Sequence, residues 1–340
     1  MKNIKNLTPV FVCGHRASGG GLYMGLLDFH PELLVFPHES KFFFLFFPFM
    51  SKKSISPQKK INHITENNLK FLKSGFFDNC HADPDYFNFN LFVKKFKNYA
   101  LRHDNWENYL LSIFQALLET TPQKTKDVKY WIERSSSSEI YALEIIKKFP
   151  NAKFIHNIRD PRDNYASMKS RWEKKLKHLD DSASIEALRQ TCIMRSTLGF
   201  DMGVSNQKLI GKKNYIFTKY DNLVETPKKE LKKIYHFLNI NDKNIKLTPT
   251  FCGLKWPGNN FEGTRYDSIS NNQSGAWRKR INDFEGALIE FHFKKFIEYF
   301  KFKLYYSETE RLEAAREHYK WLNYESKWKA DFKLATKARW

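Results

Sequence analysis

The chain has 340 residues, of which 41% are hydrophobic and 16% aromatic, and its formal net charge at pH 7 is +20. This length and composition predict a globular protein with a full hydrophobic core and argue against a disordered chain. The positive charge suits an anionic small molecule, an acidic polysaccharide or a nucleic acid. The basic runs have helical patterns with acidic neighbours, and neither zinc-finger spacing nor an RNA-binding aromatic signature occurs. We therefore expect no nucleic-acid partner.

The cysteines and the chain start predict a location. The four cysteines are dispersed, and Cys13 lies in an apolar run that predicts a core strand. This usage indicates reduced thiols and a cytoplasmic setting. Residues 1–8 carry no signal-peptide pattern, and the apolar run 43–50 is too short to span a bilayer. We expect no membrane span.

The first predicted strand leads directly into a glycine-rich turn. Residues 10–13 are apolar, and a helical apolar pattern follows the turn. In such a unit the N–H groups of the turn and the positive end of the helix dipole face one point, which binds phosphate. We hypothesise that the turn binds an anionic ester through Gly14, His15, Arg16, Ala17, Ser18, Gly19, Gly20 and Gly21. A glycine turn without a ligand is the alternative.

A second segment carries an arginine at the end of a strand. Residues 153–158 predict a strand, Asp160 and Pro161 predict a helix start, and Ser167 follows about two turns later. Arg159 then lies at the carboxyl end of the strand, where open α/β sheets bind ligands, and its guanidinium suits phosphate. A surface cluster of Arg–Asp ion pairs is the alternative.

The order of elements predicts the fold class. Strands at about 9–13, 33–36, 129–133, 153–158 and 214–219 alternate with helical patterns. We expect an α/β fold, with a P-loop-like parallel sheet flanked by helices. We assign residues 1–306 to one domain with an insertion at 51–128, and 307–340 to a C-terminal helical extension. These helices either pack on the same chain or join a homo-oligomer.

Together the two segments resemble the soluble sulfotransferases that use 3′-phosphoadenosine 5′-phosphosulfate (PAPS) and act on glycans or small molecules. The family opens with G-x-x-[RK]-S-G-T-T and L-L-D-x-H-P, which Gly14, Ser18, Gly19 and residues 26–31 match. Its R-D-P-R-D signature and the following serine match residues 159–163 and Ser167. Residues 131–135, 219–227 and 274–278 are similar to its W-x-E-K-T, Y-E-D-L-x-x-x-P and G-x-W-R motifs.

The resemblance implies a reaction and its binding groups. A sulfuryl group would pass from PAPS, the co-substrate, to a hydroxyl or amine of a carbohydrate or small-molecule acceptor, and no metal would be needed. The insertion at 51–128 would lie on the acceptor side. The turn would hold the 5′-phosphosulfate, while Arg159 and Ser167 would hold the 3′-phosphate. The stretch 240–285 folds over the nucleotide in that family, and its candidate nucleotide contacts here are Arg265, Trp277 and Arg278.

A general base is required when the acceptor is a hydroxyl. Glu39 follows the second predicted strand, and several glycan-sulfating relatives place a base glutamate there. We assign Glu39 as the base, with His38 as the alternative. A solvated loop carboxylate would have the same sequence pattern.

The turn departs from the family at three positions. Ala17 stands where the family has Lys or Arg, and Gly20 and Gly21 replace two threonines. Loss of one preorganised donor typically costs about 100- to 1,000-fold in rate. Arg16 and Arg134 are our candidates for the replacement catalytic cation. The alternatives are a weakened or inactive PAPS-binding relative and a P-loop small-molecule kinase, which the missing Walker lysine disfavours.

Overall fold

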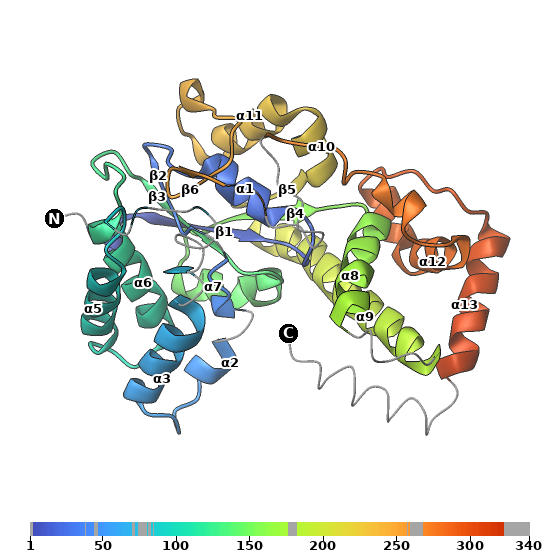
Figure 1. Cartoon of the computed structure of the whole chain (residues 1–340), viewed down its shortest axis with the longest axis horizontal. Helices are drawn as coiled ribbons and strands as arrows, with labels where there is room; N and C mark the ends of the chain where they lie inside the picture. The colour runs from blue at the N-terminus through green and yellow to red at the C-terminus, as the bar shows by residue number, and fades with distance from the viewer. Residues whose placement is uncertain are drawn as a thin grey trace.

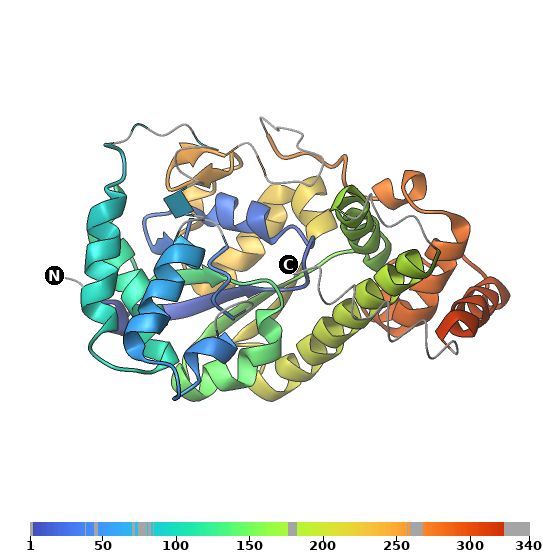
Figure 2. The ribbon, with the colours of Figure 1, turned by 60° about the horizontal axis from the view of Figure 1, so that its bottom comes forward.

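A parallel sheet of five strands lies at the centre of the structure (Figures 1 and 2). This computed structural model describes residues 3–37, 39–43, 47–69, 72–73, 80, 83, 85–175, 182–256, 258 and 268–322. The strands are β1 (Thr8–Cys13), β2 (Leu33–Val35), β3 (Tyr130–Arg134), β4 (Lys153–Ile158) and β5 (Tyr215–Lys219). They lie in the order β2-β3-β1-β4-β5, and every neighbouring pair is parallel. The predicted fold class is confirmed.

Both faces of the sheet are covered because both faces of its strands are apolar. Successive side chains of a strand point to opposite faces. Val10 and Val12 pack with α1 (Gly20–Leu27) and α11 (Pro227–Leu238). Phe11 and Cys13 pack on the other face, where the helices are α5 (Phe89–Ala100), α6 (Trp106–Thr120) and α7 (Ala142–Lys148). Burial on both faces is typical of parallel sheets.

The insertion contributes to the core of one sheet face. It includes α3 (Pro57–His63), the π-helix η3 (Ile64–Leu69), α5 and α6, preceded by α2 (Phe47–Met50). The helix predicted near 106–118 is α6, and its Ile113 and Phe114 are fully buried. Of the loop predicted at 78–89, residues 80, 83 and 85–89 are described; residues 85–88 are in neither helix nor strand, and α5 begins at the loop's last residue. The insertion's role in acceptor binding stays a prediction.

A further group of helices packs beside the carboxyl end of β4 (Figure 1). It consists of α8 (Pro161–Lys175), the long α9 (Ser182–Ile210), α12 (Asp283–Tyr299) and α13 (Glu308–Leu322). Buried Arg162 of α8 pairs with Asp160 and with Glu290 of α12. The predicted C-terminal extension starts as α13, which packs against α12 and α9, and residues 323–340 lie outside the described part. Pairing with a second copy stays a prediction.

The remaining elements connect this framework. They are the short helices η1 (Ile4–Asn6), η5 (Ser138–Tyr141), α10 (Tyr220–Glu225), η6 (Asp242–Asn244) and η7 (Ala276–Lys279), and the two-stranded sheet of β6 (Thr250–Phe251) and β7 (Leu254–Lys255). Within the described residues, every helix is too short or too polar to cross a lipid bilayer. All four cysteines are described, and none forms a disulfide.

Candidate functional site

A cleft of about 310 Å³ lies where the five parallel strands end. Its lining comes from the segments that follow β1 to β5, from Pro249, Trp256 and Gly258, and from residues 268–273. The predicted residues that line it are Arg16, Ala17, Gly19, Gly20, Gly21, Glu39, Arg134, Arg159 and Ser167. The structure therefore brings the glycine turn, the R-D-P-R-D segment and the candidate base together at one place.

The glycine turn is shaped by close backbone contacts. Gly14 has φ +127°, and a Cβ there would lie 2.4 Å from the backbone oxygen of Asn157 on β4. Its N–H donates to Oε2 of buried Glu139 at 2.9 Å. Gly19 has φ +84° and precedes the first residue of α1, which places the N-terminus of this helix at the cleft. Such a helix end attracts anions.

Some residues of the turn lie beneath the cleft instead of lining it. Gly14, His15 and Ser18 are buried, and the Ser18 N–H donates to the His15 oxygen at 3.2 Å. Asn164 of α8 donates through Nδ2 to the Arg16 oxygen at 2.6 Å. These contacts fix the shape of the turn. The side chains of His15 and Ser18 do not line the cleft.

Arg134 lies across the first residue of α1. It is 9% exposed, and a Cβ built on Gly20 would lie 2.2 Å from its Nε. The guanidinium is within 3.4 Å of Glu39 Oε2 through Nη1 and within 3.4 Å of Ser136 Oγ through Nη2. The space that a larger residue at position 20 would occupy therefore holds a cation at the helix N-terminus.

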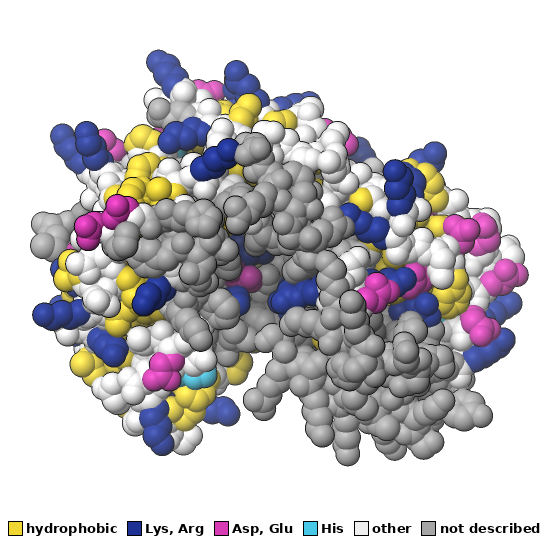
Figure 3. All heavy atoms as spheres, in the orientation of Figure 1, with side chains coloured by type: hydrophobic (Ala, Val, Ile, Leu, Met, Phe, Trp, Pro, Cys, Tyr) yellow, Lys and Arg dark blue, Asp and Glu magenta, His cyan; other side chains and the backbone are white. Residues whose placement is uncertain are grey.

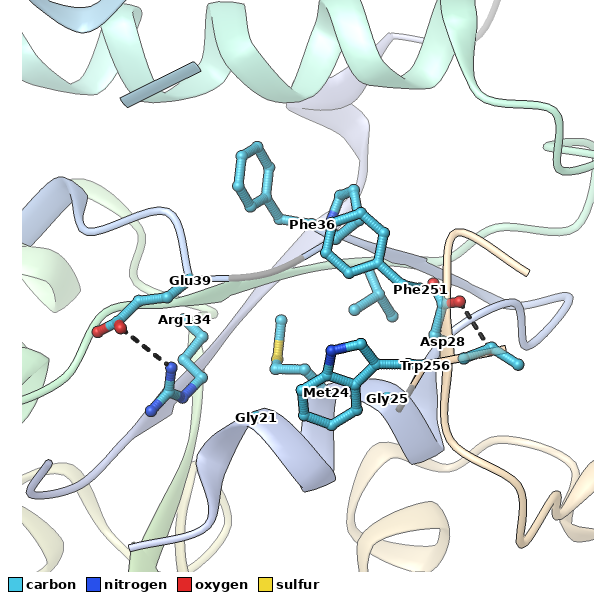
Figure 4. A pocket seen from close by; sticks show the side chains of 12 residues that line it. Gly21, Met24, Gly25, Asp28, Phe36, Glu39, Arg134, Phe251 and Trp256 are labelled. Atoms are coloured by element: carbon cyan, nitrogen blue, oxygen red, sulfur yellow. Dashed lines mark hydrogen bonds and ion pairs between the residues drawn. The ribbon is translucent and has the colours of Figure 1, made fainter. Parts of the chain in front are cut away.

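Glu39 is held beside this cation. Its Oε1 accepts the Ser136 N–H at 2.7 Å, and the Ser40 N–H donates to the Arg134 oxygen at 2.9 Å. Figure 4 shows Glu39 and Arg134 facing each other at one side of a small recess of about 20 Å³. The other side of this recess is lined by Met24, Phe36, Phe251 and Trp256. His38, the alternative base, lies outside the described residues.

A buried carboxyl group supports the segment that bears Glu39. Glu133 is fully buried, and its Oε1 accepts the Ser135 hydroxyl at 2.6 Å and the Ser40 hydroxyl. Its Oε2 has no hydrogen-bond partner among the described residues. Burial raises the pKa of Glu133 to about 7. Glu133 was predicted only as a position of the W-x-E pattern, which is the signal that the sequence offers for it.

Arg159 occupies another end of the cleft. It donates through Nη1 to the Ala17 oxygen at 2.8 Å and through Nη2 to the Gln273 oxygen, and its guanidinium lies 4.7 Å from the Tyr220 ring centroid. Its buried Nε has no partner among the described residues. An unpaired N–H on a buried guanidinium that lines a cleft suits an incoming oxyanion. Ser167 lines the same cleft.

The start of α8 agrees with the sequence expectation. Asp160 Oδ1 accepts the Arg162 N–H at 2.9 Å, and the helix begins at Pro161. Asp163 accepts the N–H groups of Gly275 at 2.7 Å and Trp277 at 2.8 Å. These two hydrogen bonds fix the segment that brings Gln273 to the cleft.

The late motif residues are not brought into the cleft. Trp277 is buried, with the Arg162 guanidinium 4.6 Å from its ring. Arg278 is exposed and lies 4.6 Å from the Tyr305 ring. Arg265 lies outside the described residues. The nucleotide contacts expected of these three residues stay predictions.

Two further cations line the cleft, and neither is among the site residues predicted from the sequence. They are Lys41, two residues after Glu39, and Arg171, one helical turn after Ser167. That spacing places Arg171 on the same face of α8 as Ser167, which was the available signal. Figure 3 shows Lys or Arg side chains beside an acidic side chain in a hollow near the middle of one face. The positive lining suits an anionic ligand.

Comparison with known proteins identifies the family. Residues 9–244 match the model described as "Sulfotransferase family", so the chain belongs to the sulfotransferase family. The sulfotransferase domain from the curacin biosynthetic pathway has a similar structure (TM-score 0.61, 15% identity), covering 88% of this chain and 99% of that one. The sulfotransferase domain from the Synechococcus PCC 7002 olefin synthase is also similar (TM-score 0.59, 17% identity), covering 88% and 97%. These two likenesses support the shared fold, and no curated protein sequence matches.

The contact between Gly20 and Arg134 predicts that the effect of Gly20→Ala on the free energy of unfolding changes sign when Arg134 is removed. Gly20→Ala alone should lower the free energy of unfolding, because the added Cβ meets Arg134 Nε at 2.2 Å. In an Arg134→Ala background the same substitution should raise it by about 0.5–1 kcal/mol, since alanine is the better helix former. Urea denaturation of the four proteins checks this cycle. The same sign in both backgrounds would contradict the contact.

The buried carboxyl of Glu133 predicts a pH dependence. Its pKa of about 7 in the folded protein exceeds the ordinary value of 4.5, so its contribution to stability is lost as pH rises from about 4.5 to 7. Glu133→Gln cannot ionise. Its free energy of unfolding relative to wild type should therefore rise across this range, by up to about 3 kcal/mol. Urea denaturation at pH 5 and pH 7.5 measures the difference, with Glu225→Gln on an exposed helix end as the matched control. A constant difference between Glu133→Gln and wild type would refute the assignment.

Proposed function

We propose that this chain transfers a sulfuryl group from PAPS to a hydroxyl or amine of a carbohydrate or small-molecule acceptor. The observation that carries the proposal is the presence of two anion-binding points in one cleft. One is the glycine turn at the N-terminus of α1, and the other is Arg159 with Ser167. PAPS carries two anionic groups, the 5′-phosphosulfate and the 3′-phosphate, and so matches this pair.

The donor groups are assigned by the chemistry of each point. The N–H groups of the turn and the positive end of the helix dipole would hold the 5′-phosphosulfate. Arg159 offers its buried Nε, and Ser167 a hydroxyl, to the 3′-phosphate. Arg159 is fixed by Ala17, Gln273 and the Tyr220 ring, so its guanidinium is preorganised for an oxyanion.

The reacting groups would meet beside Gly20. Sulfuryl transfer, like phosphoryl transfer, depends on positioning and on cations that stabilise developing charge. Arg134 lies at the N-terminus of α1 and would take the role of the Lys or Arg that the family has at the position of Ala17. Arg16 is the second candidate for this role. Glu39 lies 3.4 Å from this guanidinium and would accept the proton of the acceptor hydroxyl. The base and the cation would then act on the same reacting centre.

Two alternatives keep the same cleft. A weakened or inactive relative would bind the nucleotide and lack an effective cation, which the placement of Arg134 disfavours. A P-loop kinase would need the Walker lysine, which the turn lacks. Mg²⁺-dependent phosphoryl transfer from ATP would support the kinase over the sulfotransferase.

Calorimetric titration with adenosine 3′,5′-bisphosphate (PAP) and with 5′-AMP tests the donor site. Arg159→Ala should weaken PAP binding about tenfold or more, because a hydrogen bond to a charged group is lost, and leave 5′-AMP binding unchanged. Lys229→Gln, an exposed lysine on α11, is the matched control and should bind PAP like wild type. Failure of the wild-type protein to bind PAP would contradict the proposal.

Rate measurements test the assignment of the cation. With PAPS and a panel of simple alcohols, phenols and sugars, Arg134→Met should lower kcat about 100- to 1,000-fold, followed as PAP release. Ala17→Lys should change kcat little, because Arg134 already supplies the charge. A large rise in kcat for Ala17→Lys, with no loss for Arg134→Met, would instead support the weakened relative.

A further inference from the structure

Cations from four separate segments gather around Glu39. Arg16 comes from the turn after β1, Lys41 from the segment after β2, Arg134 from the end of β3 and Arg171 from α8. Among the described residues that line the cleft, Glu39 is the one acidic side chain. The local charge is therefore strongly positive.

These cations act on one another. Burial and the neighbouring Arg171 lower the pKa of Arg16 to about 10, and Arg134 acts in the same direction. The pKa of Lys41 is lowered by burial and by Arg16, Arg171 and Arg134, while Glu39 opposes this shift. Like charges held this close repel one another, and an anion placed among them removes that cost.

The contacts proposed for PAPS do not use all of these cations. Arg159 lies against the Ala17 and Gln273 oxygens and the Tyr220 ring, and Arg134 lies over Gly20. These two arginines, Ser167 and the N–H groups of the turn match the anionic groups of PAPS. Lys41, Arg171 and Arg16 are additional cations that line the same cleft as Glu39 and interact with it electrostatically.

The position of Lys41 is imposed by its surroundings. Its φ is +56°, which is uncommon for a residue with a side chain. The preceding Ser40 is fixed by its N–H bond to the Arg134 oxygen at 2.9 Å and by its hydroxyl bond to buried Glu133. The Phe42 N–H donates back to Ser40 Oγ at 3.0 Å. Backbone strain of this kind persists where the surrounding structure determines it, and it concentrates at ligand sites.

The route of the acceptor follows from the two cavities. The recess beside Glu39 has a volume of about 20 Å³ and an apolar lining of Met24, Phe36, Phe251 and Trp256 (Figure 4). It has room for about one water molecule, so the body of an acceptor does not fit there. An acceptor reaches Glu39 from the main cleft instead, whose lining includes Arg16, Lys41 and Arg171.

We infer that Lys41, Arg171 and Arg16 form an anion subsite for the acceptor, and that the acceptor carries a phosphate, sulfate or carboxylate close to the group that is sulfated. This inference rests on the proposed function and adds the acceptor class to it. Lys41 and Arg171 bind that oxyanion, which orients the acceptor hydroxyl or amine toward Glu39. Arginine and lysine are suited to such groups as a planar fork and a point charge, respectively.

The test is titration of the PAP-saturated protein with inorganic phosphate, sulfate and acetate, followed by tryptophan fluorescence because Trp256 lines the cleft. Wild type should bind at least one of these anions with PAP in place. Lys41→Gln and Arg171→Gln should each weaken that binding about tenfold or more, since each removes a charged hydrogen-bond donor. Lys41→Arg should retain it, and Lys229→Gln should match wild type. The affinity of Lys41→Gln for PAP should stay within about twofold of wild type.

Three outcomes would overturn the inference. The first is that PAP binds but none of the anions binds to the PAP-saturated protein. The second is anion binding that neither Lys41→Gln nor Arg171→Gln alters. The third is a tenfold loss of PAP affinity in Lys41→Gln, which would assign this lysine to the donor. In all three the proposed function survives, whereas failure of wild type to bind PAP removes the proposed function itself.

Discussion

The cleft depends on how closely the chain at Gly14 crosses the backbone of β4. A side chain at this position would lie 2.4 Å from the Asn157 oxygen, and the φ of +127° disfavours any residue other than glycine. The turn therefore begins directly at the carboxyl end of β1, and the Gly14 N–H donates to Oε2 of Glu139. Because the turn then leads to Gly20, the N-terminus of α1 faces the cleft. The charged side chains that line the cleft share it with this helix end.

Buried carboxyl groups support this charged surface from within. Glu133 and Glu139 are both fully buried, and burial raises the pKa of each to about 7. Each holds a backbone segment that enters the cleft, Glu133 through Ser40 and Ser135 and Glu139 through Gly14. Asp163 has the same role for the segment at Gly275 and Trp277. The cations thus line the cleft, while carboxyl groups behind it fix the loops that carry them.

The features that sequence predicts best are those encoded locally. The bounds of the five strands lie within one residue of their predicted positions, because each strand carries buried apolar residues within a short segment. The turn and Arg159 follow from short motifs for the same reason. Arg134 over Gly20 was predicted only as a candidate cation, since the contact depends on the register that pairs Val12 of β1 with Arg134 of β3. No local pattern encodes that register.

The late motif is held by contacts that no local pattern predicts. Asp163 accepts the Trp277 N–H, and the Trp277 ring lies 4.6 Å from the Arg162 guanidinium. Arg278 lies at the surface beside Tyr305, and its contact with the nucleotide stays a prediction. Lys41 and Arg171 lie close in sequence to Glu39 and Ser167, but the other cations that share the cleft with them come from different segments of the chain. Tertiary packing, which local patterns do not contain, brings these cations together.

The fit of Arg134 against Gly20 couples the substitutions that the two positions accept. If an ancestral turn carried a larger residue at position 20, an arginine placed as Arg134 now is would have met its Cβ at about the distance found here, 2.2 Å. Loss of the side chain at position 20 leaves only a gap, which a flexible arginine can later fill. With the arginine in its present position, a larger residue at position 20 therefore requires that side chain to move, so a substitution at one of the two positions changes what the other tolerates.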